Sequence, residues 1–344
     1  MKVLGIESSC DETAVAVLDE NKNIYSDLVV SQIDLHKEFG GVVPEIASRN
    51  HLDIIDKIVE KGLEQSNLTF KDIDVVVATT GPGLMGGLIV GAITAQTIAS
   101  VIKKPFIGVN HLEGHLLTTR LTDGVDFPYL TFLLSGGHTQ ILLVKNIGEY
   151  EKIGETIDDS LGECFDKVGQ MIGLEYPAGP KIEKLALNGN ENKYKFTKPL
   201  INAIGKGVRS EHQYNFSFSG LKTAVRILVE KMGTLTEQNK CDISASFQKT
   251  VVDILINRFI NVVENYLKIY PKKMVFAGGV SANQYIKNNM KDICRKYDME
   301  VVSPPLKLCT DNAVMIAWAG LERYKAGLYK KQDFLEIKAR WDLN

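Results

Sequence analysis

The sequence predicts an α/β fold of two duplicated halves. Three observations support this: a repeated segment, an alternation of strands with helices, and the length of the chain. The repeat runs from Val3 to Leu18 and again from Tyr129 to Val144, and each copy has an apolar strand, a tight turn of small and polar residues, and a second apolar strand. The 344 residues suffice for two domains of about 150 residues each. Such a turn leaves backbone N–H groups facing outward, where they can receive a phosphate. The pattern therefore predicts two related halves that close on one nucleotide.

Strands and helices alternate over most of the chain in the order β-β-β-α-β-α-β, which returns in looser form after Phe127. A short β-branched run at Val75–Thr80 is typical of a buried parallel strand, and Phe106–Asn110 is the next strand. A helix of small residues begins at about Gly86, after a Gly-Pro-Gly turn. Further helices are predicted over Pro44–Ser66, Asp242–Leu267 and Asp311–Lys325, and Met274–Asn283 is predicted to be a strand, a glycine turn and a helix start. This order is typical of a duplicated α/β architecture.

The repeat also suggests where the chain divides into lobes. We expect an N-terminal lobe of residues 1–110 together with about 326–344, and a C-terminal lobe of residues 111–325. Residues 189–212 are polar and lack clear periodicity, so they are predicted to form an insertion loop on one lobe. No low-complexity linker separates the lobes, so the boundary near Asn110–His111 depends on the repeat alone.

Composition and charge exclude several classes of protein. The formal net charge is −2, so any RNA contact must come from a local basic patch, such as residues 193–209, which is otherwise interpreted as a solvated loop. The five cysteines include no Cys-x-x-Cys pair, which favours a reducing cytosol over a disulfide scaffold. The chain enters a strand at once, without a signal peptide. Glycine, threonine and glutamine interrupt the apolar run from Leu84 to Ile102, which favours a buried helix over a membrane span. We therefore expect a cytoplasmic protein with no membrane contact.

The segment HLEGH places His111 and His115 four residues apart, so on a helix both rings share one face and can reach one ion. Surface or capping histidines are the commoner interpretation of such a pair. Asp311, at a predicted helix start, is a candidate third ligand, and the alternative is that it caps that helix. Glu113 lies two residues from each histidine and should point to the opposite face, which argues against a metalloprotease of the H-E-x-x-H kind.

Both turns of the repeat carry groups suited to chemistry. In SGGHT, Gly136 and Gly137 allow close backbone approach to a ligand, although a plain hairpin turn explains these glycines equally well. The first turn holds three carboxylates, which suggests a nearby ion or a general base, against the alternative of an acidic surface turn. The polar residues of the first turn are Glu7, Ser8, Ser9, Asp11 and Glu12.

Ten segments together resemble one family. They are GIESSCDETA, GGVVPEIASRNH, TTGPGLMGGL, NHLEGH, LLSGGHTQ, GECFDKVG, YPAGP, FSFSGLKTA, AGGVSAN and CTDNA. In this order, from about Met1 to Trp341, they look like the tRNA N6-adenosine threonylcarbamoyltransferases of the TsaD type, in their bacterial or organellar form, once classed as O-sialoglycoprotein endopeptidases. The resemblance implies the two-lobed fold of the actin, Hsp70 and sugar-kinase superfamily, with a nucleotide cleft between the lobes.

The resemblance also implies the site residues. It places one divalent metal ion, Fe²⁺ or Zn²⁺, on His111, His115 and Asp311. It implies that threonylcarbamoyl-AMP is held by Leu134, Ser135, Gly136, Gly137, His138, Asp166, Gly179, Glu183 and Asn283. One departure is Ala178, where the family usually has a second glycine in Y-P-G-G-P. Its methyl group would either crowd the ligand or be absorbed by the packing.

The expected reaction is transfer of the threonylcarbamoyl group from threonylcarbamoyl-AMP to N6 of adenosine 37 in tRNAs that read ANN codons. Asp11 or Glu12 would accept the amine proton. The implied partners are the tRNA, a shorter TsaB-like paralogue and a small TsaE-like P-loop ATPase. Two competing hypotheses are an ATP-dependent phosphotransferase of the same superfold, which does not require the histidine pair, and a non-catalytic scaffold.

Overall fold

The computed structural model describes residues 1–39, 41–201, 212–329 and 335–343. Most of the second half of the predicted insertion, residues 202–211, therefore lies outside the described residues, as do residues 330–334 and 344 of the predicted N-terminal lobe. The chain divides into two compact units, the first of residues 1–126, 146–150 and 304–344 and the second of residues 127–145 and 151–303. This division differs from the expected boundary at residue 110, because the helix that follows residue 110 packs against the last helix of the chain inside the first unit.

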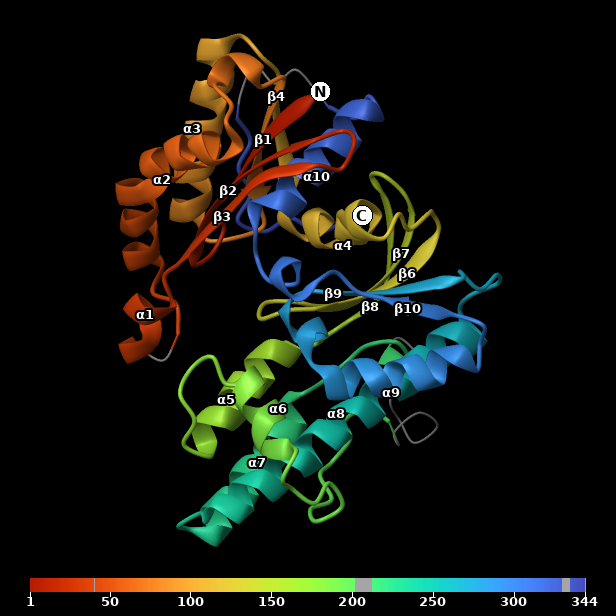
Figure 1. Cartoon of the computed structure of the whole chain (residues 1–344). Coiled ribbons are helices and arrows are strands. Elements are labelled where there is room, and N and C mark those ends of the chain that lie inside the picture. The colour runs from red at the N-terminus through yellow and green to blue at the C-terminus, as the bar shows by residue number, and fades with distance from the viewer. Residues whose placement is uncertain (40, 202–211, 330–334, 344) are drawn as a thin grey trace. The chain divides into compact units, whose positions relative to one another are not determined.

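Five strands form the sheet of the first unit, in the order β3-β2-β1-β4-β5. The first four of them, β1 to β4, are labelled in Figure 1. They are β1 (Lys2–Glu7), β2 (Glu12–Asp19), β3 (Ile24–Ser31), β4 (Val75–Gly81) and β5 (Phe106–Asn110). The central strand β1 pairs antiparallel with β2 and parallel with β4. All seven residues of β4 are buried, as its apolar, β-branched sequence predicted.

Helices cover both faces of this sheet. They are α2 (Pro44–Ser66), α3 (Met85–Ile102), α4 (His111–Thr122) and α10 (Ala313–Lys325). The first unit also contains the short helix α1 (Ile33–His36) and 3-10 turns at Lys37–Phe39, Phe70–Asp72 and Leu306–Leu308. Leu4 and Ile6 of β1 join a core with residues of α2 and α3. Gly5, between them, faces α10, where a Cβ would lie 2.7 Å from that of Ala317. Successive residues of the strand thus serve opposite faces of the sheet.

The helix α3 is buried on one side only, so the expectation of a buried helix is wrong for its other side. Its buried residues are Gly87, Leu88, Gly91, Ala92, Ala95 and Ala99. Met85, Ile89 and Ile93 are 45%, 40% and 50% exposed. The small residues on the buried side let the helix approach β4 and α2 closely. Among the described residues, α3 alone is long and apolar enough to span a membrane by length and composition.

The second unit repeats the strand arrangement of the first. Its strands are β6 (Tyr129–Leu134), β7 (Thr139–Asn146), β8 (Glu149–Glu155), β9 (Lys273–Ala277) and β10 (Glu300–Val302). Their order is β8-β7-β6-β9-β10, with β6 antiparallel to β7 and parallel to β9, which corresponds strand for strand to β3-β2-β1-β4-β5. The two copies of the repeated segment are the hairpins β1–β2 and β6–β7. The predicted duplicated α/β fold is therefore confirmed.

The helices of the second unit share one buried core with β6, β7 and β9. They are α5 (Leu161–Met171), α6 (Gly179–Ala186), α7 (Ser219–Met232), α8 (Glu237–Asn265) and α9 (Gln284–Arg295), with a 3-10 turn at Gly279–Ala282. This core centres on Phe132 of β6, whose ring centroid lies 5.9–6.5 Å from those of Phe216, Phe259 and Phe276. Helix α8 begins five residues before the predicted start, because Thr236 and Asn239 form a capping box.

Candidate functional site

The pair of histidines lies at the start of α4, directly after β5. Asn110 caps this helix, since its side-chain oxygen accepts a hydrogen bond from the backbone N–H of Leu112 at 2.8 Å. His111 and His115 are one helical turn apart and both are buried, with ring centroids 4.9 Å apart and the rings edge to face. The predicted placement of both rings on one helix face is confirmed.

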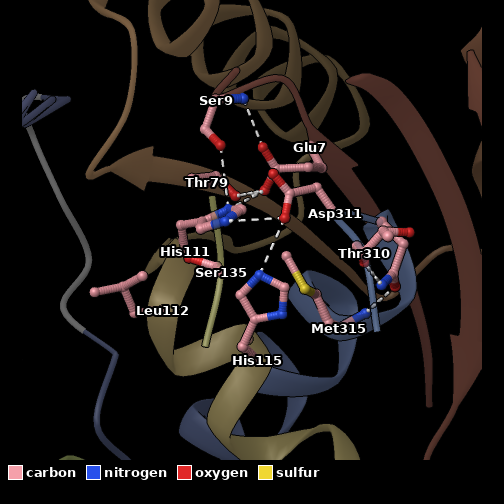
Figure 2. Close-up of polar contacts among 12 residues, drawn as sticks. Glu7, Ser9, Thr79, His111, Leu112, His115, Ser135, Thr310, Asp311 and Met315 are labelled. Atoms are coloured by element: carbon pink, nitrogen blue, oxygen red, sulfur yellow. Dashed lines mark hydrogen bonds and ion pairs between the residues drawn. The ribbon is translucent and has the colours of Figure 1, made fainter. Parts of the chain in front are cut away.

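Asp311 faces both histidines from the segment that leads into α10 (Figure 2). Its Oδ1 lies 3.0 Å from Nε2 of His115 and 3.3 Å from Nε2 of His111. The alternative role as a helix cap is wrong, because Asn312 is the N-cap of α10 and accepts a hydrogen bond from the N–H of Met315 at 2.9 Å. Asp311 thus lies one residue outside the helix, and its carboxylate is directed at the imidazoles.

The three side chains form a possible metal site. Their ligand atoms all lie within 4.8 Å of one another. In a tetrahedral site with bonds of about 2.0–2.1 Å, neighbouring ligand atoms are about 3.3 Å apart. The observed separations of 3.0 and 3.3 Å between Asp311 and the two imidazoles are close to that value. Two imidazole nitrogens and a carboxylate suit Zn²⁺ or Fe²⁺, the two ions that the family resemblance implies.

Charges within this cluster stabilise one another. Burial opposes ionisation of Asp311, but His111 and His115 outweigh it and hold the pKa of the Asp311 carboxyl well below its usual range. Burial likewise opposes protonation of His111, but Asp311 and Glu7 raise the pKa of that imidazole well above its usual range. The negative charges of Asp311 and Glu7 that favour the imidazolium would also attract a metal cation, which must displace the proton from the ligating nitrogen.

Glu113 points away from this cluster. Its carboxylate accepts hydrogen bonds from the hydroxyl of Tyr150 at 2.5 Å and from Nη1 of Arg323 at 2.7 Å. Burial raises its pKa, although Arg323 opposes that shift. The prediction that Glu113 lies on the opposite face of the helix is confirmed, and its carboxylate does not face the histidines as a metalloprotease base would.

The turn between β1 and β2 carries Asp11 and Glu12, the predicted proton acceptors. Asp11 is buried, so the alternative of an acidic surface turn is wrong for this residue. Burial raises the pKa of Glu12 well above its usual range, and the neighbouring carboxylates of Asp311 and Asp11 add to the rise. His51 of α2 fixes the turn, since its Nε2 lies 3.0 Å from the carbonyl oxygen of Cys10 and its Nδ1 lies 2.7 Å from the hydroxyl of Thr13.

In the second unit, residues Leu134–His138 form the turn between β6 and β7. The amide of Ser135 donates to the carbonyl of His138 at 2.8 Å, and the amide of His138 donates to the hydroxyl of Ser135 at 3.0 Å. At Gly136 and Gly137 a Cβ would meet no atom within 4 Å, so the space over this backbone is open. The helix α5 begins beside the turn, and a Cβ on Gly162 would lie 2.7 Å from the carbonyl oxygen of Ser135.

The side chains of three other residues that are predicted to bind the adenylate make hydrogen bonds within the protein. Asp166 accepts a hydrogen bond from the amide of Ala178 at 2.7 Å, and Glu183 accepts one from the amide of Gln284 at 2.7 Å. Asn283 caps α9 through its side-chain oxygen and donates to Gln248 at 2.8 Å. The open backbone at Gly179, where a Cβ would meet nothing within 4 Å, contrasts with these engaged side chains.

The methyl group of Ala178 is absorbed by packing. A Cβ on Gly169 of α5 would lie 2.1 Å from the Ala178 Cβ, so the methyl group rests against this glycine and is buried. The departure from the family pattern is therefore accommodated inside the second unit.

Sequence reasoning assigned no individual role to two residues beside the histidines. The sequence presents Glu7 only as one of three acidic residues in the first turn, and Thr79 only as part of a strand. In the structure, Glu7 contacts the His111 ring, and the hydroxyl of Thr79 donates a hydrogen bond to Glu7 (Figure 2). Their positions in the sequence could have identified them, because each lies at or near the carboxyl end of a strand, where ligands bind in open α/β sheets.

Comparison with known proteins agrees with this geometry. The profile described as "TsaD: tRNA N6-adenosine threonylcarbamoyltransferase" matches residues 23–318. A relative of that name from Rickettsia massiliae is 48% identical over 347 residues, covering 100% of this chain and 98% of the relative. Others of the same name, from Brucella suis and Rhizobium johnstonii, are 48% and 46% identical and cover 100% of this chain and 96% and 94% of their own lengths.

Two solved structures share the architecture. Full-length HypF, in its phosphate- and nucleotide-bound form, aligns with a TM-score of 0.61 at 15% identity over 96% of this chain and 47% of that chain. Component A of the Acidaminococcus fermentans (R)-2-hydroxyglutaryl-CoA dehydratase aligns with a TM-score of 0.55 at 14% identity over 95% of this chain and 98% of its own. At such identities the likeness shows the fold alone, which is the duplicated α/β architecture described above. Since the profile match and the full-length relatives agree, the chain belongs to the TsaD family of tRNA N6-adenosine threonylcarbamoyltransferases.

Proposed function

We propose that this chain transfers the threonylcarbamoyl group from threonylcarbamoyl-AMP to N6 of adenosine 37 in tRNAs that read ANN codons. Family membership makes it a transferase that modifies tRNA. The observation that carries the proposal further is the convergence of His111, His115 and Asp311 on one point within a chain of this family. A phosphotransferase of the same superfold would not require this cluster.

His111, His115 and Asp311 would hold one divalent cation, Fe²⁺ or Zn²⁺. Three protein ligands are typical of catalytic rather than closed structural sites. Bound there, the cation would act as a Lewis acid toward substrate oxygens. The chain's own contribution is to fix the ligand side chains on two helix starts, each with its own capping asparagine.

The adenylate would contact the Leu134–His138 turn. Within the described residues the amides of Gly136 and Gly137 have no protein acceptor, so they are free to bind the phosphate and to stabilise charge on the departing AMP. The open backbone at Gly179 would allow equally close approach. Asp166 and Glu183 stay in the proposed set, because a carboxylate can accept about four hydrogen bonds and each retains acceptor capacity for a ribose hydroxyl.

The attacking amine of adenosine is a poor nucleophile, because its lone pair is delocalised into the ring. Asp11 or Glu12 would accept its proton, and the raised pKa of Glu12 supports Glu12, since an effective base has a pKa near the working pH. A cation bound beside it would lower that pKa again. A positioned base of this kind contributes about 10²–10⁴-fold to the rate.

The partners follow from the family resemblance. We assign a shorter paralogue to the exposed apolar side of α3, where Met85, Ile89 and Ile93 recur every four residues and Leu52 of α2 is also exposed. The P-loop ATPase partner and a cytoplasmic location rest on the resemblance alone.

A reconstituted reaction tests the proposed activity. The purified chain, with and without the shorter paralogue, is incubated with threonylcarbamoyl-AMP and an unmodified ANN-decoding tRNA, and the digested nucleosides are analysed by mass spectrometry. We expect adenosine to gain one threonylcarbamoyl group. Unmodified adenosine in the presence of both proteins, together with ATP consumption on a small acceptor, would favour the phosphotransferase instead.

A second experiment tests the metal site. Asp311→Ala should lower the metal content found by elemental analysis, because it removes one of three ligands. Asp292→Ala is the matched control, since the Asp292 side chain is 74% exposed on α9 in the other unit. Full metal content in Asp311→Ala would remove this carboxylate from the site.

A further inference from the structure

We infer that Glu7 is a positioning residue for the metal centre: it fixes the ring of His111 so that Nδ1 faces the Glu7 carboxylate and Nε2 faces the ion. The inference rests on the proposed function, because it takes His111 as a metal ligand.

Burial makes the position of this carboxylate well determined. Glu7 ends β1 and is only 1% exposed. A buried carboxylate is tolerated where hydrogen bonds satisfy its oxygens. Oε1 accepts from the amide of Ser9 at 2.5 Å, and Oε2 accepts from the hydroxyl of Thr79 at 2.5 Å (Figure 2). These two donors, one from the turn after β1 and one from β4, hold both oxygens in place.

The remaining contact of Oε2 is with Nδ1 of His111, at 3.0 Å. A carboxylate can only accept hydrogen bonds, so the shared proton belongs to Nδ1 of the imidazole. Nε2 is then the nitrogen whose lone pair is available to a metal ion, and it is the one that lies 3.3 Å from Asp311 Oδ1. The hydroxyl of Ser9, 3.1 Å from the same Nδ1, reinforces this orientation.

Glu7 is not a fourth ligand of the cluster. The three side chains whose ligand atoms converge are His111, His115 and Asp311, and Glu7 is not among them. Both of its oxygens are engaged by protein donors. A carboxylate that binds the second nitrogen of a metal-bound histidine sets the ring orientation and raises its basicity as a ligand. The geometry around Glu7 matches that arrangement.

Ring-nitrogen NMR tests the orientation directly. In the zinc-loaded protein with ¹⁵N-labelled histidines, we expect Nδ1 of His111 to carry a slowly exchanging proton and Nε2 to carry none. In Glu7→Gln the protecting carboxylate is lost, so this proton should exchange faster. Finding zinc on Nδ1 of the wild-type protein would overturn the inference without any variant.

Zinc affinity gives a second readout. Glu7→Gln should raise the zinc dissociation constant by about 10–100-fold, measured by competition with a chelator. Glu113→Gln is the matched control, because Glu113 is also 1% exposed, lies on the ligand helix and bonds Tyr150 and Arg323 rather than a histidine. Equal zinc affinities for Glu7→Gln and the wild type would contradict the positioning role.

The outcomes separate the two proposals. If the wild type binds zinc, Asp311→Ala loses it and Glu7→Gln retains full affinity, only the inference about Glu7 fails. If the wild type and Asp311→Ala have the same zinc content, the metal site of the proposed function fails first. Should Glu7→Gln not fold, Thr79→Val removes one donor to the same carboxylate and should raise the zinc dissociation constant by a smaller factor; unchanged zinc affinity would contradict the inference.

Discussion

The proposed role of Glu12 as a proton acceptor requires an ionised carboxylate, whereas its burial favours the protonated form. Burial first, and then the charges of Asp311 and Asp11, raise its pKa well above the ordinary value of 4.5. The folded chain therefore binds the Glu12 proton more tightly than the unfolded chain does. An acid of this kind stabilises the fold below its unfolded pKa, and that stability is lost as the pH rises through its folded pKa. A proton acceptor held in this way lowers stability at neutral pH.

We predict that Glu12→Gln raises the melting temperature of the chelator-treated protein at pH 7–8, because glutamine carries no charge to bury. The difference from wild type should vanish near pH 4.5 and grow as the pH rises toward the folded pKa of Glu12. Thermal unfolding across this pH range measures it. Glu60→Gln, on the exposed side of α2, should show no such trend. If Glu12→Gln were less stable than wild type at every pH, the raised pKa of Glu12 would be contradicted. Glu12→Gln should also slow threonylcarbamoyl transfer.

For single residues, the sequence correctly predicted the arrangement of side chains that are only a few positions apart in the chain. The His111–His115 pair follows from helical geometry, and the direction of Glu113 from the same geometry. The link to Asp311 spans about 200 residues, so spacing offered it only as a candidate and the family resemblance supplied it. The pairing of Glu7 with His111 had no local signal, because it depends on the parallel order of β1, β4 and β5.

Small residues decide how several elements approach one another. Gly169 of α5 faces Ala178 in the turn before α6, and a Cβ there would lie 2.1 Å from the alanine methyl. The extra methyl at residue 178 is thus matched by the absence of one at residue 169. The turn is also tied to α5 by Asp166, which binds the Ala178 amide.

We predict that Gly169→Ala lowers the free energy of unfolding by up to about 2 kcal/mol. Overpacking costs about 1–3 kcal/mol, and alanine regains up to about 1 kcal/mol in helix propensity. Urea denaturation measures the change. Adding Ala178→Gly should restore the loss, whereas Gly179→Ala should cause no loss, since its Cβ would meet no atom within 4 Å. A Gly169→Ala variant as stable as wild type would show that the turn relaxes freely.

The exposed side of α3 leads to a prediction about association. Ile93→Glu should abolish binding of the shorter paralogue, because it buries a charge in an apolar contact, and it should leave the melting temperature unchanged, because Ile93 is 50% exposed. Light scattering of the mixed proteins measures the complex. Ile227→Glu, at an isoleucine 56% exposed on α7, is the control. Intact association in Ile93→Glu would assign the paralogue to another surface.

Element boundaries were predicted where the signals are local. Pro44 and Asn67 bound α2 at the expected residues, because proline suits a first helical turn and residue 67 adopts the left-handed conformation that ends a helix. The sidedness of α3 was not predicted, because large apolar residues occur on both of its sides: Leu88 is buried, whereas Ile89 and Ile93 are exposed.

At the scale of the whole chain, duplication was predictable and the division into units was not. The hairpin sequence that occurs twice predicts that the two units have matching strand orders, as the structure shows. The assignment of α4 and residues 304–325 to the first unit depends on packing between segments almost 200 residues apart, which leaves no mark on local sequence.

The C-terminal segment shows how distant residues complete the first unit. The amide of Lys338 donates to the carbonyl of Thr80 at 2.8 Å, and the amide of Gly83 donates to the carbonyl of Ala339 at 3.2 Å. The side chain of Asn110, which caps the ligand helix α4, donates to the carbonyl of Trp341 at 3.0 Å. The last described residue, Leu343, is buried. This segment therefore helps to hold the start of the helix that carries both histidines.

We predict that truncation after Arg340 weakens zinc binding about five-fold and lowers the melting temperature. Asn110 would lose a hydrogen bond worth about 1 kcal/mol, which corresponds to that factor, and Leu343 would lose its burial. Chelator competition and calorimetry measure the two effects. Trp341→Ala is the matched control, because it retains the carbonyl that accepts from Asn110 and removes only the side chain, which lies 5.3 Å from the Lys338 ammonium. The truncated chain should therefore bind zinc more weakly than Trp341→Ala, and equal affinities would mean that α4 is positioned without the C-terminal segment.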